Sequence, residues 1–162
     1  MLPSESVQIR NCRADEIEIA RSVFDAAFSP MANIYRFVGE ALARQEKRFQ
    51  EGVRLAAFID GQMVATMQYR LDARHVHLIG LAVLPEYQRR GIGRRLVEQV
   101  AILAPTLGHD TLALDTIAET GNVLIFKKWG FTVSRSEPAT DCVSDRYVAL
   151  HVVNMECKLS IG

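Results

Sequence analysis

The chain has 162 residues, 49% of them hydrophobic, and its acidic and basic side chains balance to a formal net charge of zero. This length predicts one domain over residues 1–162, with enough apolar side chains to bury a core. The zero net charge argues against nucleic acid as a partner, because general nucleic-acid binders are usually strongly basic. No apolar run approaches the ~20 residues that span a bilayer, so no membrane partner is expected.

Cysteine usage indicates the cellular compartment. The three cysteines, Cys12, Cys142 and Cys157, are far apart and odd in number. This pattern fits a reducing compartment better than a disulfide framework. The first ten residues also lack the basic segment and apolar stretch of a secretory signal. We therefore expect a cytoplasmic protein.

The first half of the chain predicts a strand, two helices and a hairpin. Apolar periodicity indicates a short strand at residues 6–10 and helices at 15–28 and from about 34 to 51. Two apolar segments, 55–59 and 63–71, flank Asp60-Gly61, which is a strong signal for a tight hairpin turn.

The second half alternates strands and helices. A strand is expected at residues 76–83 and is ended by Pro85, because proline has no amide to donate to a sheet. The elements that follow are a helix at 91–104, a strand at 111–116, a short helix at 123–129 ended by Gly130, and strands at 131–135 and 148–159. Strands 76–83 and 111–116 should be parallel, since a helix connects them. The order predicts an α/β fold with a mixed sheet of about seven strands flanked by helices.

A strand that runs into a glycine- and arginine-rich loop and then a helix is the most informative feature of the sequence. The loop reads Gln88-Arg89-Arg90-Gly91-Ile92-Gly93. Amides at a helix start point toward an anion, and the helix dipole favours negative charge there. The glycines allow close backbone approach, and the arginines can bond to phosphate. The loop lacks the Lys-Ser/Thr pair of a P-loop and the third glycine of a dinucleotide fingerprint.

This loop resembles the Q/R-x-x-G-x-G/A core motif of the GNAT superfamily of acyl-CoA N-acyltransferases. The expected order of elements matches that family's fold over nearly the whole chain. The resemblance implies that the loop amides hold the pyrophosphate of CoA and that the preceding strand pairs with the pantetheine arm. The cofactor-binding residues that it implies are Leu81, Ala82, Val83, Gln88, Arg89, Arg90, Gly91, Ile92, Gly93 and Arg94.

A second match lies downstream, where residues 122–131 resemble the family's N-x-x-A-x-x-x-Y-x-x-x-G-F segment. Alignment on Gly130-Phe131 puts Phe126 at the tyrosine that, in many members, protonates the departing CoA thiolate. Phenylalanine has no hydroxyl, so this tyrosine mechanism is absent here. The usual asparagine position falls on Glu119, three residues before Asn122. The resemblance implies that Asn122 and Phe126 lie at the CoA site, and we expect the Phe126 ring to pack beside the pantetheine arm.

Acyl transfer to an amine needs a base or a water chain that takes the amine proton. In the histone-acetylating branch of the family, a glutamate base lies four residues before the position of Leu81, and here that position is His77. Histidine titrates near neutrality, which suits a base, although a structural hydrogen bond is its alternative role. Asp115, at the end of its strand, is the other candidate base or a partner for the substrate ammonium; capping the next turn is its alternative role. Alternation along the strand predicts one shared face for His75, His77, Ile79, Leu81 and Val83.

Several weaker candidates remain open. Glu119 is a third candidate base, and Cys142 is a candidate nucleophile without an identifiable activating neighbour. Tyr147 and His151 either line the acceptor pocket or are ordinary strand residues. No metal is expected at a pair of His75 and His77, because a third ligand is not evident in the sequence.

The expected function is therefore that of an N-acetyltransferase. It would move an acetyl group directly from acetyl-CoA to a primary amine acceptor, which is a small molecule, a peptide N-terminus or a lysine. The alternative is a non-catalytic acyl-CoA-binding sensor or partner subunit, and the lack of a hydroxyl at Phe126 keeps it open. Dimers are frequent in families of this kind, so a homodimer is one expected assembly.

Overall fold

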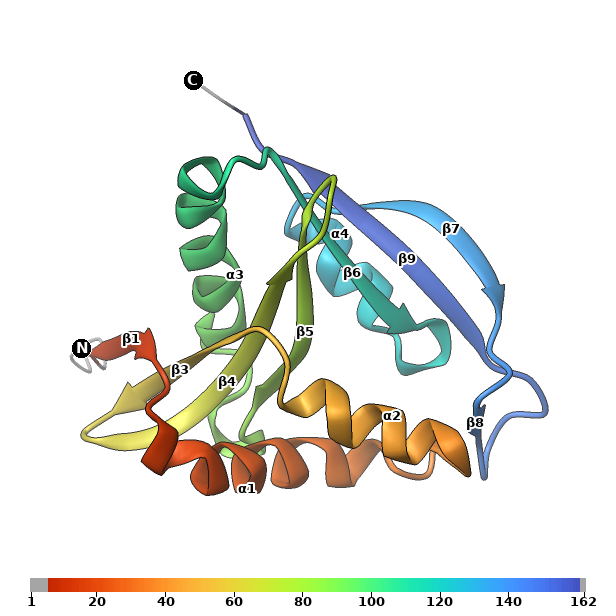
Figure 1. The fold of residues 1–162 in the computed structure, drawn as a ribbon. Coiled ribbons are helices and arrows are strands. Elements are labelled where there is room, and N and C mark those ends of the chain that lie inside the picture. Colours follow the sequence, from red (N-terminus) through yellow and green to blue (C-terminus); the bar gives the residue numbers. More distant parts are fainter. Residues whose placement is uncertain (1–5, 161–162) are drawn as a thin grey trace.

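Seven strands form the central mixed sheet of the computed structural model, which describes residues 6–160 (Figure 1). Adjacent strands are antiparallel except β5 and β6, which are parallel, as predicted. The predicted α/β fold class is therefore confirmed. In spatial order the strands are β1 (Val7–Asn11), β3 (Val53–Ile59), β4 (Gln62–Leu71), β5 (Val76–Val83), β6 (Thr111–Ile117), β9 (His151–Lys158) and β7 (Thr132–Pro138).

Helices cover both faces of this sheet. α1 (Ile17–Phe28) and α2 (Glu40–Phe49) lie on one face, and α3 (Ile92–Leu103) and α4 (Asn122–Lys128) lie on the other (Figure 1). No helix within residues 6–160 is long and apolar enough to cross a membrane.

Each face of the sheet buries its own apolar core. Strand β3 contributes to both: Leu55, Ala57 and Ile59 pack in the core with α3, whereas Ala56 and Phe58 pack with α1. A strand buried on both faces reads as a continuous apolar run rather than an alternating one, and this explains the sequence at 55–59.

The hairpin predicted at Asp60-Gly61 is confirmed. Both residues have positive φ angles, 51° and 79°, and they join β3 to β4. Two consecutive left-handed residues are typical of the type I′ turn, whose twist matches that of the flanking strands. The turn fixes the pairing of Ile59 with Gln62 and of Phe58 with Met63, and the register shifts beyond Phe58 at a bulge.

The second helix is shorter than the sequence indicated. α2 spans Glu40–Phe49 rather than residues 34–51, because Gly39 breaks the helix with a φ of 62°. Before it, β2 (Arg36–Phe37) pairs with β8 (Cys142–Val143) in a separate two-stranded sheet. This pairing joins residues more than 100 positions apart, so local periodicity carried no signal for it.

A bulge in β5 corrects the predicted strand face. Its register against β4 shifts after Ile79, and Gly80 has a φ of 64°. The extra residue reverses the alternation, so Leu81 packs with Leu78 in the core beside α3. His77 points to the opposite face, toward Asp115. The expectation that His77 and Leu81 share a face is therefore wrong.

Candidate active site

The loop before α3 has the backbone shape that an anion cradle requires. Arg89 and Gly91 both have positive φ angles, 65° and 78°, and Gly91 is the N-cap of α3. Gln88 donates its Nε2 to the carbonyl of Val83 at 3.1 Å, which fastens the loop to the end of β5. Successive amides that alternate between left- and right-handed conformations form a concave site for anions, here at a helix N-terminus.

The two glycines of this loop serve different purposes. A Cβ on Gly91 would meet nothing within 4 Å, so its left-handed conformation is the reason for glycine. A Cβ on Gly93 would lie 3.4 Å from Trp129 and 3.6 Å from Leu81. Glycine at position 93 therefore lets α3 pack closely against β5 and α4, which the sequence interpretation had attributed to ligand approach.

Three arginines around the loop, Arg90, Arg94 and Arg95, already have partners within the protein. Arg94 pairs with Glu98 at 3.2 Å, and Arg95 donates to the carbonyl of Val7 at 3.4 Å. The guanidinium of Arg90 lies over the ring of Tyr87, 5.1 Å from its centroid. Arg94 and Glu98 are both largely exposed, so an anion at the loop competes only with a weak surface pair.

A slot opens where β5 and β6 diverge. The two strands pair only at Val76↔Leu112 and His77↔Ala113 and separate beyond these residues (Figure 1). Phe126 of α4 lies at this slot, with its ring edge-on to Trp129 and Phe131. The slot is a cavity of about 40 Å³ lined by Met67, Leu78, Ile79, Gly80, Leu81, Val97, Leu114, Asp115 and Phe126.

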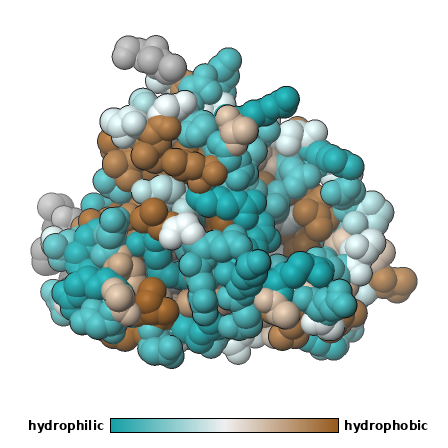
Figure 2. Space-filling model, in the orientation of Figure 1, coloured by the Kyte–Doolittle hydropathy of each residue, from teal (hydrophilic) through white to brown (hydrophobic). Residues whose placement is uncertain are grey.

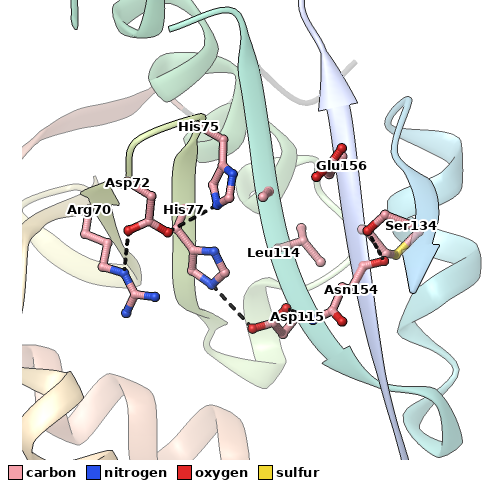
Figure 3. Close-up of a pocket in the computed structure, with 11 residues that line it drawn as sticks. Arg70, Asp72, His75, His77, Leu114, Asp115, Ser134, Asn154 and Glu156 are labelled. Carbon is pink, nitrogen blue, oxygen red and sulfur yellow. Dashed lines mark hydrogen bonds and ion pairs between the residues drawn. The ribbon is translucent and has the colours of Figure 1, made fainter. Parts of the chain in front are cut away.

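A larger polar cavity lies beside the slot, on the sheet face that α1 and α2 leave open. Its volume is about 300 Å³ (Figure 3). Figure 2 shows that this side of the molecule is mostly hydrophilic. The lining residues are Arg70, Asp72, His75, His77, Ala113, Leu114, Asp115, Ser134, Asn154, Met155 and Glu156.

Most of these polar lining residues were missed by the sequence interpretation, which named only the histidines and Asp115. Strand pairing brings two of the missed residues to the cavity: Arg70 lies opposite His77 on β4, and Asn154 lies opposite Asp115 on β9. Neither pairing has a local signal. The register becomes predictable only once the neighbours in the sheet are known.

The structure brings the two candidate bases together. Nε2 of the buried His77 lies 3.5 Å from Oδ2 of Asp115, whose other oxygen accepts a hydrogen bond from Asn154 (Figure 3). The Arg48 guanidinium is 3.8 Å from the same carboxylate. Burial raises the pKa of Asp115, but the hydrogen bonds from His77 and Asn154 and the nearby charges outweigh it, so the pKa falls below its usual value. Asp115 is therefore ionised at neutral pH.

Asp115 also lies where the two cavities meet, since it lines both the slot and the polar cavity. A ligand in the slot and a second ligand in the polar cavity would approach each other beside this carboxylate. The arrangement suits a group transfer between two substrates that enter from different sides.

A buried polar network holds the C-terminus of α2 near Asp115. Nε2 of Gln68 has the carbonyls of Arg48, Phe49 and Glu51 within hydrogen-bonding distance, at 2.7–3.0 Å, for its two hydrogens. Arg54 donates to the same Phe49 carbonyl at 2.8 Å. The Phe49 carbonyl, one of the last four of α2, thus accepts from both side chains in place of a helical amide. They thereby hold Arg48 beside the candidate bases.

The remaining candidates have other partners. Glu119 accepts the backbone amide of His151 at 2.7 Å and contacts its ring at 3.2 Å. Burial raises the pKa of the Cys142 thiol, which disfavours the reactive thiolate. Asn122 begins α4, and its backbone amide donates to the Thr120 hydroxyl. The side chain of Tyr147 is exposed.

The structure places a third potential metal ligand beside the two histidines. The sequence interpretation found no third ligand beside His75 and His77. In the structure, Asp72 lies next to them, and one donor atom from each of the three residues falls within 4.8 Å of the others. Asp72 lies only three residues before His75, and the turn between β4 and β5 brings its carboxylate to 3.2 Å from the His75 ring.

Comparisons with known proteins agree with this architecture. The sequence profile of the acetyltransferase (GNAT) family matches residues 20–131. No curated protein sequence matches the chain. The ribosomal-protein-S18-alanine N-acetyltransferase of Escherichia coli has a similar structure, with a TM-score of 0.72, 19% identity, and coverage of 97% of this chain and 96% of that one.

Two further similar structures contain acetyl-CoA. They are yncA of Salmonella typhimurium with its cofactor acetyl-CoA (TM-score 0.70, 20% identity, coverage 96% and 95%) and a GNAT family acetyltransferase of Elizabethkingia anophelis with acetyl-CoA bound (TM-score 0.69, 17% identity, coverage 94% and 98%). At these identities the likeness establishes the fold. Because the family profile spans more than half of the sequence, the chain belongs to the GNAT family of acetyltransferases.

Proposed function

We propose that this protein is an N-acetyltransferase that moves the acetyl group of acetyl-CoA directly to a primary amine. The observation that carries the proposal is the position of Asp115, which lines both the slot and the polar cavity and contacts His77. The donor would occupy the slot and the acceptor would occupy the polar cavity. The protein would act in the cytoplasm as one domain, and a homodimer remains a prediction.

In this proposal the loop and the slot bind the two parts of CoA. The amides from Gln88 to Arg94 hold the pyrophosphate at the N-terminus of α3. The pantetheine arm lies along β5, against the backbone of Leu81, Ala82 and Val83, and Phe126 forms the wall of the slot. Asn122, at the start of α4, lies on the same side of the sheet. The similar structures that contain acetyl-CoA support this placement.

The proposed chemistry is direct transfer. The pair of His77 and Asp115 takes a proton from the acceptor ammonium, and the free amine nitrogen attacks the thioester carbonyl. A C–N bond forms, the C–S bond breaks, and CoA leaves as a thiolate. The nitrogen loses its second proton as the amide forms, and because Phe126 has no hydroxyl, water relays that proton to the thiolate.

The contacts of His77 indicate which residue of the pair is the base and which one orients it. Asp115 is ionised and accepts from Nε2 of His77, which orients the ring and leaves Nδ1 with its lone pair. A base held by a third group is the usual arrangement for activating a nucleophile. His77 is therefore the proposed base and Asp115 the group that orients it.

The second candidate function is a non-catalytic acyl-CoA sensor or partner subunit, favoured by the missing hydroxyl at Phe126. The test is release of CoA thiol from acetyl-CoA in the presence of small amines, peptides with free N-termini and lysine peptides. Thiol release that requires an acceptor supports the enzyme. Tight acetyl-CoA binding with no release for any acceptor class supports the sensor.

A further inference from the structure

The hairpin between β4 and β5 gathers three metal-ligand side chains at one end of the polar cavity. Asp72 and His75 lie in its loop, and His77 follows on β5 (Figure 3). Oδ2 of Asp72 is 3.2 Å from Nε2 of His75, and the amide of Asp72 donates to the carbonyl of His75 at 2.9 Å. The backbone bond closes the turn and holds the two ligand-bearing residues together.

The spacing of these atoms suits a small divalent ion. Zinc binds histidine nitrogen and carboxylate oxygen at ~2.0–2.2 Å in tetrahedral sites, so neighbouring ligand atoms lie ~3.3–3.5 Å apart. The separation of 3.2 Å between Asp72 and His75 is close to that edge. The three donor atoms lie within 4.8 Å of one another, so a modest side-chain rotation of His77 would complete three corners. The fourth corner would open into the cavity.

The groups around the three ligands favour metal binding. Nε of Arg70 holds Oδ1 of Asp72 at 3.3 Å, which orients the carboxylate and leaves Oδ2 for the ion. Glu51 lies 3.6 Å from Arg70 and offsets its charge. Nε2 of His77 faces Asp115 at 3.5 Å, where carboxylates stand behind metal-bound histidines, so Nδ1 would be the ligand atom.

We propose that Asp72, His75 and His77 form a binding site for a divalent transition ion of the zinc type, and that its occupancy inhibits acetyl transfer. The ion would occupy the Nδ1 lone pair of His77, which then cannot take the acceptor proton. The binding site stands on the geometry alone. Only the inhibition rests on the proposed function.

Direct metal binding tests the site without any activity assay. Protein freed of metal with EDTA and then dialysed competes with a chromophoric chelator for Zn²⁺. We expect one ion per chain, and His75→Gln and Asp72→Asn should each weaken its affinity more than about tenfold. The matched control is His109→Gln, which removes a histidine outside the cluster and should leave the affinity unchanged. Melting temperatures of the variants, whose side chains are partly exposed, check that they fold.

Three results would overturn the site. The first is that the protein takes no Zn²⁺ from the chelator, and the second is that His75→Gln binds Zn²⁺ as tightly as the wild type. The third is a thiolate charge-transfer band in the absorption spectrum after Co²⁺ is bound in place of Zn²⁺, which would assign the ion to cysteine. Inhibition is tested separately with an accepted amine. Zn²⁺ should inhibit the wild type, and His75→Gln should need more than tenfold higher Zn²⁺ for the same inhibition. Zinc binding without inhibition would refute the second half of the proposal, whereas a failure of acetyl transfer itself would leave the binding result standing.

Discussion

Gly91 offers a matched pair of substitutions that separates charge from backbone strain at the CoA loop. Alanine and glutamate at this position share the cost of a left-handed φ, which is about 1–2 kcal/mol. A Cβ at this position meets nothing within 4 Å, so neither substitution forces a clash at its first side-chain atom. A domain of ordinary stability tolerates this cost. Glutamate should be no less stable than alanine, because a negative charge at the N-terminus of α3 is favourable.

Acetyl-CoA binding should distinguish the two variants. A glutamate charge about 5 Å from one phosphate charge costs about 0.8–3 kcal/mol for effective dielectric constants between 80 and 20. Calorimetry should therefore give Gly91→Glu an acetyl-CoA affinity roughly 4- to 200-fold weaker than Gly91→Ala. The difference should shrink at high salt if the glutamate stays exposed. Equal affinities for the two variants at low salt would refute the assignment of the pyrophosphate to this loop.

Three further predictions follow from the site and from the first strand. His77→Gln and Asp115→Asn should each lower kcat/KM by about 10²–10⁴-fold in steady-state assays, leave acetyl-CoA affinity unchanged, and be non-additive because the residues act as a pair. Phe126→Tyr should bind acetyl-CoA almost normally, whereas Phe126→Ala should lose affinity and about 2 kcal/mol of unfolding free energy, less than for a fully buried ring; unaltered stability and affinity would place the ring outside the slot. The hydrogen bond from Arg10 lowers the pKa of Glu16 from 4.5 to about 2. The ionised Glu16 therefore adds to the free energy of unfolding in full above pH 4.5, and this contribution is lost as the pH falls toward 2. The free energies of unfolding of the wild type and Glu16→Gln, measured with denaturant, should therefore converge as the pH falls. A difference between them that stays the same at every pH would contradict this.

Local signals in the sequence were sufficient for much of the fold. The Asp60-Gly61 turn fixes its own backbone angles, and the glycine at position 91 marks the start of α3. The strand at Val76–Val83 was predicted to the residue, because Pro85 ends it. Signals of this kind act within a few residues and need no knowledge of distant neighbours.

The errors arose where distant segments decide the outcome. The bulge at Gly80 reverses a strand whose alternation appears regular in the sequence, and it placed His77 and Leu81 on opposite faces. The candidate site likewise depends on both local signals and distant pairing. Sequence reasoning proposed His77 and Asp115 separately, and the parallel pairing of β5 with β6 brings them into contact. Asn154 joins them through the antiparallel pairing of β6 with β9, which no spacing in the sequence reveals. Asp72 lies only three residues before His75, so its spacing was visible in the sequence and was overlooked.

The central claim is direct transfer from a thioester in the slot to an amine in the polar cavity. It is tested most directly by mass spectrometry after incubation with acetyl-CoA carrying a deuterated acetyl group and an amine panel that spans the three acceptor classes. The account predicts labelled acetyl on an amine nitrogen, an equal amount of free CoA, and no label on the protein. Label on a cysteine of the protein before it appears on the amine, or bound acetyl-CoA that never transfers its label to any class, would contradict the account.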